Sequence, residues 1–230
     1  MAIYNPTAIN RPMRGFAQVP NLGVNRTLEG WREVWSNRIG LPPMQTYATL
    51  SKGLPDTTKV YIDLADSEFT IRSDLPDRTR VLEFDGKLDL GTAKTLRLKE
   101  IRVHEEHRGK GIGTQAFENL VAFAGMIGLQ QINLRAGREN GPVFWTKRGL
   151  KIETDGQLAE VFSNGVRSAF ENLPDTQQAE YADDLERALE CIDEKTHQRV
   201  LQIGAAQTGT TEVGEALLSE TEPRMFMEIG

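Results

Sequence analysis

Alternating apolar and polar residues predict three β-strands in the first half of the chain. Residues 59–64, 80–84 and 95–103 each place apolar side chains at nearly every second position, as half-buried strands do. The Asp85-Gly86 pair is typical of a turn and should end the second of these strands.

The third strand is irregular and leads into a helix. Its apolar positions change parity between Leu98 and Ile101, which indicates a β-bulge or a strand buried on both faces. Helical spacing then runs from residue 111 to residue 127, and Gly128 suits the end of that helix. A short strand at residues 131–135 follows.

The N-terminal side is predicted from helix breakers. Residues 1–26 contain three prolines among polar residues and should be irregular. We expect a short helix from Thr27, which can cap it, and a second one from the Pro42-Pro43 pair to about Ser51.

The C-terminal side is predicted to be mainly helical. A helix should begin near Pro142 and end at Gly149, and a last strand should cover residues 150–153. From Gly204 the chain looks loose, with at most a short helix near Glu215. Three amphipathic stripes predict helices between these segments: Leu158, Val161, Phe162, Val166, Phe170 and Leu173; Leu185, Ala188, Leu189 and Ile192; and Val200, Leu201 and Ile203.

Charge varies strongly along the chain. Its 230 residues carry 27 basic and 33 acidic side chains, with net +3 over residues 1–56 and net −9 over residues 174–230. Together with the predicted elements, this suggests an N-terminal arm (1–56), a mixed α/β core (57–156) and an acidic helical extension (157–230).

Several classes of protein are disfavoured. Binding nucleic acid by bulk charge needs a basic excess, which is absent. The single Cys191 excludes an internal disulfide and a multi-cysteine zinc site. The chain shows neither a signal-peptide pattern nor an apolar run long enough to span a bilayer, so we expect a cytoplasmic protein without a membrane partner.

One segment carries recognisable chemistry. Arg108-Gly-Lys-Gly-Ile-Gly113 lies between the end of a predicted strand and the start of a predicted helix. Glycines allow a sharp turn and a close approach of the backbone to a ligand. Because the first N–H groups of a helix are unpaired and lie at the positive end of its dipole, this segment predicts a phosphate or pyrophosphate site.

The glycine pattern alone leaves alternatives open. No P-loop sequence occurs, but Gly111-x-Gly113-x-x-Ala116 matches a dinucleotide-binding turn. That turn requires an acidic residue about 20 positions further on, where the chain has Asn133 and Arg135. A nucleotide-dependent oxidoreductase is therefore a minor alternative.

A third interpretation explains more residues. Arg108-x-x-Gly111-x-Gly113 after a strand resembles the acyl-CoA-binding motif of the GCN5-related N-acetyltransferases (GNAT). Phe144-Trp145 followed by Gly149-Leu150 resembles that family's later Phe-Tyr-x-x-x-Gly-Phe segment. The resemblance covers about residues 57–155 and implies a mixed, mostly antiparallel split sheet flanked by helices.

The resemblance also implies roles for individual residues. Glu100 is the candidate base that takes a proton from the acceptor amine. Trp145 stands where the family often has a tyrosine that protonates the departing thiolate, a step that indole cannot perform. The residues expected to bind acetyl-CoA are Ile101, Val103, Arg108, Gly109, Lys110, Gly111, Ile112, Gly113, Thr114 and Asn140.

The function that follows is transfer of an acetyl group from acetyl-CoA to an amine. The acceptor is a small molecule or a protein amine, and the acidic balance weakly favours a cationic one. The alternative is a catalytically weak or inactive interaction module that works through its helical extensions. Those C-terminal helices are also the candidate surface for a homodimer or a protein partner.

The remaining reactive residue types have plainer interpretations. His104 and His107 are expected to be polar loop residues rather than metal ligands, because a zinc site requires three or four ligands. No metal cofactor is expected. Cys191 lies among apolar residues and should be buried, whereas His197 lies near charged residues and should be exposed.

Overall fold

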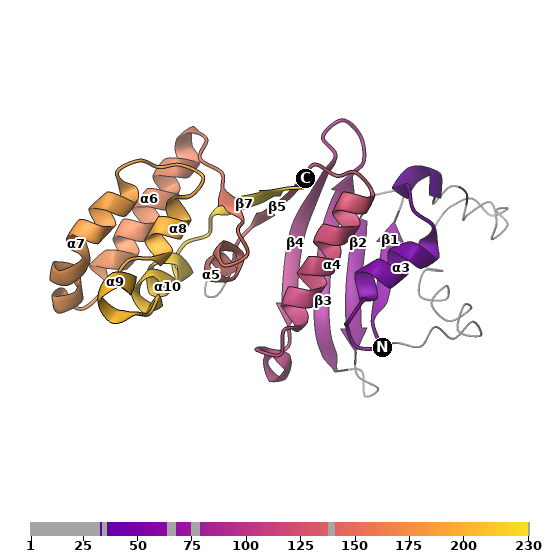
Figure 1. Ribbon diagram of the computed structural model, residues 1–230, viewed down its shortest axis with the longest axis horizontal. Coiled ribbons are helices and arrows are strands. Elements are labelled where there is room, and N and C mark those ends of the chain that lie inside the picture. Colours follow the sequence, from indigo (N-terminus) through magenta and orange to yellow (C-terminus); the bar gives the residue numbers. More distant parts are fainter. Residues whose placement is uncertain (1–32, 34–35, 64–67, 75–78, 138–140, 230) are drawn as a thin grey trace. The chain divides into compact units, whose positions relative to one another are not determined.

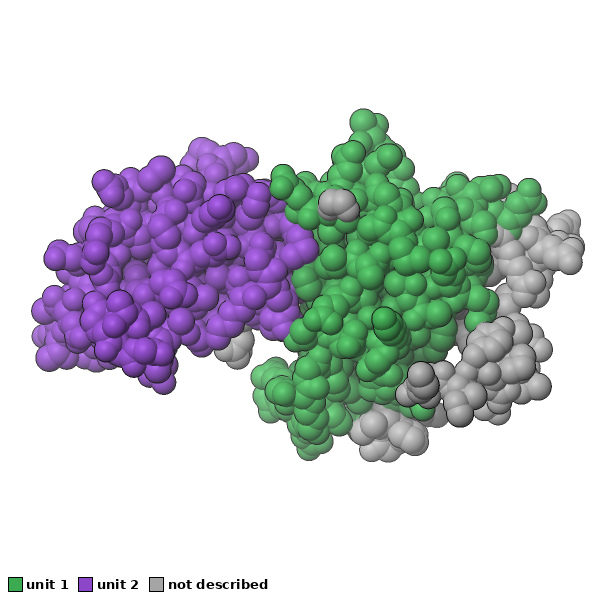
Figure 2. All heavy atoms as spheres, in the orientation of Figure 1, with its two compact units in different colours: residues 1–132, 228–230 green, residues 133–227 purple. Residues whose placement is uncertain are grey.

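The computed structural model describes residues 33, 36–63, 68–74, 79–137 and 141–229. The contacts within the chain define two compact units, formed by residues 1–132 with 228–230 and by residues 133–227 (Figure 2). The irregular stretch predicted for residues 1–26 lies outside the described residues. Of the helix predicted from Thr27, the structure describes residues 33 and 36–39, which are helical.

In the described part of the first unit, successive strands pair antiparallel: β1 (Lys59–Asp63), β2 (Glu68–Asp74), β3 (Arg80–Asp89) and β4 (Thr95–Val103) (Figure 1). The predictions for β1 and β4 are confirmed. Strand β2 was not predicted; its apolar Phe69 and Ile71 are flanked by polar residues that gave a weak alternating pattern.

The predicted turn at Asp85-Gly86 is wrong, because β3 continues through it to Asp89. Gly86 serves packing instead: a Cβ placed there would lie 2.2 Å from Cε1 of Phe69. The register shifts between Asp85 and Gly86, since Asp85 pairs with Glu100 whereas Gly86 pairs with Leu98. Strand β4 therefore carries one extra residue at the predicted parity change, and the predicted bulge is confirmed.

The bulge keeps the apolar side chains of β4 on one face of the sheet. Helices α3 (Pro43–Ser51) and α4 (Ile112–Met126) lie on this face (Figure 1). Both helices match their predictions, and Gly128 follows α4 with a positive φ of 71°. The buried residues of the apolar face include Phe69, Ile71, Leu82, Phe84, Leu96 and Leu98.

A buried amide fastens α3 to α4. Asn119 on α4 donates from Nδ2 to the carbonyl oxygens of Leu50 (3.2 Å) and Lys52 (2.7 Å) at the end of α3. Its Oδ1 accepts a hydrogen bond from Gln115 Nε2 at 3.0 Å. All the strong hydrogen-bonding atoms of this side chain are thus satisfied, as its burial requires.

The second unit is mainly helical. Strand β5 (Gln131–Arg135) leads into it and matches its prediction. The unit then contains α5 (Gly141–Thr146), β6 (Lys151–Ile152), α6 (Gly156–Glu171), α7 (Asp175–Leu189), α8 (Thr196–Leu201), α9 (Ala205–Thr208), α10 (Glu212–Ser219) and β7 (Arg224–Glu228). Among the described residues the strands follow the order β1-β2-β3-β4-β5-β7-β6, a mixed sheet with one parallel pair, which confirms the predicted fold class.

Several predictions for the second unit need correction. The strand near residue 150 is not the last one, because β7 pairs antiparallel with it through Ile152 and Met225. Val161 is 67% exposed, since the buried face of α6 is formed by Phe162 and the residues one and two turns later. Cys191 is exposed rather than buried, because α7 has already ended at Leu189.

Among the described residues, no helix is long and apolar enough to cross a membrane.

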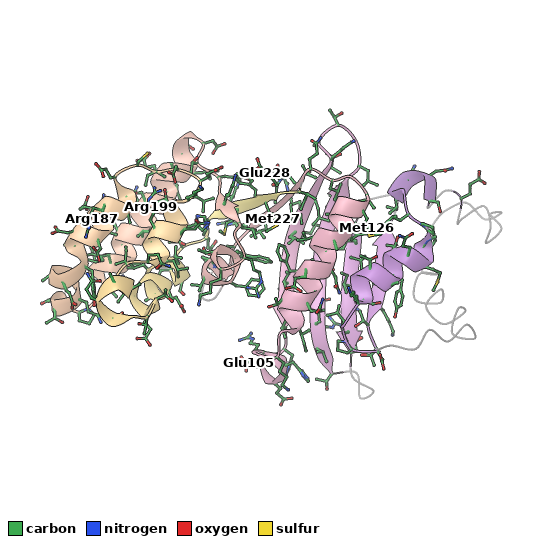
Figure 3. All side chains as sticks on the ribbon, viewed as in Figure 1. Glu105, Met126, Arg187, Arg199, Met227 and Glu228 are labelled. Atoms are coloured by element: carbon green, nitrogen blue, oxygen red, sulfur yellow. The ribbon has the colours of Figure 1, made fainter. Side chains whose placement is uncertain are left out.

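His197 is completely buried on α8, contrary to the predicted exposure. Its charged neighbour Arg199 (Figure 3) points back to the end of α7 and binds both carboxylate oxygens of Asp193 at 3.0 and 3.1 Å. Neither ring nitrogen of His197 has a hydrogen-bond partner of good geometry. Burial lowers the pKa of His197 to about 4, an effect that the nearby backbone of Leu150 opposes only in part.

Replacing Gly86 by alanine should destabilise the first unit. The added methyl group would collide with the Phe69 ring, which lies on the buried face of β2. Overpacking of this kind costs about 1–3 kcal/mol, measurable by urea unfolding. Gly125→Ala is the matched control, because its Cβ would meet only Ile229 Cγ2 at 3.7 Å. Equal stability of the two variants would contradict the packing role of Gly86.

Burial of His197 should make the protein less stable in acid. Its folded-state pKa of about 4 lies below the unfolded value of 6.5, so stability is fully present above pH 6.5 and is lost as the pH falls towards 4. Between pH 7 and pH 5 this loss amounts to about 2 kcal/mol. In urea unfolding at both pH values, His197→Leu should lack this component, whereas a variant of the exposed His104 should keep it.

Candidate functional site

The candidate site is built on the connection between β4 and α4. The N–H of His104 donates to the Val81 carbonyl at 3.1 Å and makes the last bond to β3. A short 3₁₀ helix, η2 (Glu105–His107), follows, and α4 begins five residues later at Ile112. Glu105 marks this connection in Figure 3. The predicted order of strand, glycine-rich turn and helix is therefore present.

The end of β4 presents backbone groups away from β3. Successive residues of an antiparallel strand direct their N–H and C=O groups to opposite sides. Because His104 bonds to β3, Arg102 does so as well, and Ile101 and Val103 turn their backbone groups the other way. These are the two strand residues that the sequence resemblance assigns to acetyl-CoA.

Two glycines shape the turn. Gly109 and Gly111 have φ values of 74° and 78°, a conformation that side chains with a Cβ rarely adopt. A Cβ at either position would meet nothing within 4 Å. Glycine is thus required by the backbone conformation rather than by crowding, and the space beside the turn is open.

The turn and the helix start present backbone donors. Gly111 precedes α4, and its carbonyl accepts the first helical bond from the N–H of Gln115 at 2.9 Å. Within the described part of the chain, no protein acceptor engages the N–H groups of residues 109–113. Thr114 lies in the same first helical turn. Such unpaired donors at a helix start favour an anion.

Basic side chains flank these donors. Arg108 Nε donates to the Val103 carbonyl at 3.1 Å, and its NH1 lies 3.8 Å from Glu105 Oε1. Arg108 therefore braces the turn against the strand end, while Lys110 is exposed. The donors, the open space and the cation together suit an anionic group.

Glu100 lies on the polar face of the sheet, opposite the face covered by α4. Its carboxylate binds Arg102 with Oε1 2.5 Å from NH2 and remains 44% exposed. Ile101 and Val103 share its strand but belong to the other face. The structure thus places the candidate base beside the candidate binding strand, with its side chain already paired.

One carboxylate near Glu100 was missed from the sequence. Asp85 on β3 pairs directly with Glu100 across the ladder. The Asp-Gly pair predicts a turn at this position, and only the register of β3 reveals that Asp85 lies within a strand. The parity change in β4 was a sequence signal for this arrangement. A β-bulge requires a paired neighbouring strand, so β3 has to continue past residue 84 and include Asp85.

The other sequence candidates are less informative. Asn140 lies outside the described residues. Trp145 is buried, 7% exposed, and its ring meets that of Phe144 edge-on at 4.7 Å. His104 and His107 flank or belong to η2, with ring centroids 6.3 Å apart. Among the described residues, no three His, Cys, Asp or Glu side chains are grouped as metal ligands require.

Comparison with known proteins gives a match that includes the connection between β4 and α4. Residues 76–143 match the acetyltransferase (GNAT) family. No curated protein sequence matches the chain. Solved structures similar to part of it include nourseothricin acetyltransferase (21% identity, TM-score 0.33, 38% of this chain and 52% of the other). Another is the IAA acetyltransferase of Bacillus cereus (20% identity, TM-score 0.33, 38% of this chain and 57% of the other).

A third similar structure is the PaiA N-acetyltransferase of Thermoplasma acidophilum in complex with coenzyme A (21% identity, TM-score 0.31). That match covers 39% of this chain and 54% of the other. The chain thus spans about half the length of these three proteins. The match to the GNAT acetyltransferase family covers residues 76–143, which contain β3, β4, the glycine-rich turn and α4.

Proposed function

We propose that this protein transfers an acetyl group from acetyl-CoA to an amine. The observation that carries the proposal is the run of unpaired N–H groups at residues 109–113, at the start of α4 and within the matched family segment. An anion-binding turn directly after a strand with outward-facing backbone groups suits a ligand with a pyrophosphate and an amide-bearing arm.

The residues have distinct tasks in this proposal. The N–H groups of the turn and Lys110 hold the pyrophosphate, and Arg108 keeps the turn attached to β4. The backbone of Ile101 and Val103 binds the pantetheine arm, and Asn140 assists. When bound, the thioester supplies an activated acetyl group. Backbone donors at the end of β4 would then stabilise charge on the thioester oxygen.

The acceptor amine must lose a proton before it attacks, and Glu100 is the candidate base. Its exposed position on the polar face leaves room for an amine. Trp145 cannot protonate the leaving thiolate, so that proton comes from water. The acceptor is a small-molecule or protein amine, and the acidic balance of the chain favours a cationic one.

Binding of acetyl-CoA should depend on the backbone of the turn. Gly111→Ala forces an L-residue into a left-handed conformation, at a cost of roughly 1–2 kcal/mol, and adds a methyl group beside the donors. Titration calorimetry should show affinity reduced about tenfold. Gly125→Ala, at the other end of α4, should bind like the parent. A parent protein that does not bind micromolar acetyl-CoA would refute the proposed function.

Turnover should be detectable as thiol release from acetyl-CoA with a panel of alkylamines, spermidine and lysine-containing peptides. Glu100→Gln should lower kcat/KM for the amine at least tenfold, as loss of a proton-accepting or amine-binding carboxylate would. Glu118→Gln removes an exposed carboxylate on α4 and should leave the rate unchanged. Binding of acetyl-CoA without release of thiol by any amine would favour the alternative, a non-catalytic interaction module.

A further inference from the structure

A second carboxylate faces the position proposed for the amine. The antiparallel register aligns Thr70 on β2, Asp85 on β3 and Glu100 on β4 in one row across the polar face. Directly opposed residues in such a ladder have their Cβ atoms about 5 Å apart. The bulge lies next to this row, since the next residue of β3, Gly86, pairs with Leu98, two residues before Glu100 on β4.

The two carboxylates of this row differ in their partners. Glu100 is neutralised by Arg102 in an ion pair. Asp85 has no cation within ion-pair distance among the described residues, even though it is half-buried. Uncompensated negative charge directly opposite another carboxylate is unfavourable. An ammonium group between the two would offset that cost.

A hydroxyl group fixes the orientation of Asp85. Thr70 Oγ1 donates to Asp85 Oδ1 at 2.5 Å. Within the described structure Oδ2 has no hydrogen-bond partner, so it keeps its acceptor capacity. Thr70 is itself half-buried in the middle of β2 and is therefore held by the sheet.

The charged groups around Asp85 do not replace such a partner. Glu83, two residues earlier on β3, is occupied by Arg72 and Arg80. Lys99, the extra residue of the bulge, is bound to Glu68. The exposed residues Lys87 and Arg97 lie opposite each other in the β3–β4 register. Neither side chain lies within ion-pair distance of Asp85.

We propose that Asp85 is a further catalytic residue: in place of Glu100, it takes the proton of the acceptor ammonium, and the carboxylate of Glu100 helps to hold that ammonium. This inference rests on the proposed acetyl transfer. In the step, one N–H bond of the ammonium breaks, its proton passes to Asp85 Oδ2, and the electron pair stays on nitrogen. The neutral amine can then attack the thioester carbonyl, and Asp85 returns the proton to water.

A matched pair of amines separates proton removal from structural damage. Ethylamine is charged at pH 7, like a lysine side chain with its pKa of about 10.4. Trifluoroethylamine is nearly the same size but uncharged at this pH, because its fluorines withdraw electrons. For Asp85→Asn, kcat/KM should fall about a hundredfold with ethylamine. With trifluoroethylamine it should change less than threefold.

The pH profile gives a second readout. Below the pKa of ethylamine, the free-amine fraction rises about tenfold per pH unit. The rate of Asp85→Asn with ethylamine should follow that rise between pH 7 and pH 9, whereas the parent rate should rise less steeply. Asp89→Asn, which alters a carboxylate at the end of the same strand, should behave like the parent.

Thr70 acts as a positioning residue in this scheme. Thr70→Val should lower kcat/KM for ethylamine about tenfold through loss of the bond to Oδ1, and Thr70→Ser should restore it. Equal losses of Asp85→Asn on both amines, or no loss on either, would overturn the role of Asp85 even if the parent is active. A parent that releases no thiol with any amine removes the proposed function itself, and the Asp85 proposal with it.

Discussion

The close packing of Phe69 on Gly86 is the constraint on which the sheet of the first unit depends. No side chain larger than hydrogen fits at Gly86, and here β4 gains one residue relative to β3. In a pleated strand, a shift of one residue moves every later side chain to the opposite face. The bulge therefore keeps Ile101 and Val103 on the apolar face and sends Glu100 to the polar face. The geometry of the candidate site is a consequence of that single offset.

Helix α4 links the hydrophobic core to the anion-binding turn. Its buried residues pack on the sheet, and Asn119 fastens it to the carbonyl groups at the end of α3. Its N-terminus lies at the end of β4, where Gly109 and Gly111 have positive φ values and a Cβ would meet nothing within 4 Å. The body of α4 is thus packed and hydrogen-bonded to the rest of the unit, whereas N–H groups at its start have no protein acceptor among the described residues. This arrangement suits a ligand that adds charge without reorganising the core.

The polar face of the sheet and the second unit show how charge is distributed in this protein. On the sheet, Glu83 forms ion pairs with Arg72 on the neighbouring strand β2 and with Arg80 on its own strand, whereas the partner of Asp85 among the described residues is the hydroxyl group of Thr70. In the second unit, Arg199 on α8 donates to the carbonyl oxygen of Ala188 at the end of α7, and burial lowers the pKa of His197, so that its ring is neutral at pH 7.

The strand, the glycine-rich turn and the helix of the candidate site could be predicted from the sequence, because glycine conformation and helical periodicity are local properties. The sequence also determined the parity change in β4, since alternation is read along one strand. Tertiary structure alone decided that Asp85 belongs to a strand, that Glu100 is paired with Arg102, and that His197 is buried whereas Cys191 and Val161 are exposed. Strands β2 and β7 were likewise recognisable only through their neighbours. Register, pairing and burial depend on residues distant in the chain, and a local pattern of polar and apolar positions contains no information about which of them will meet.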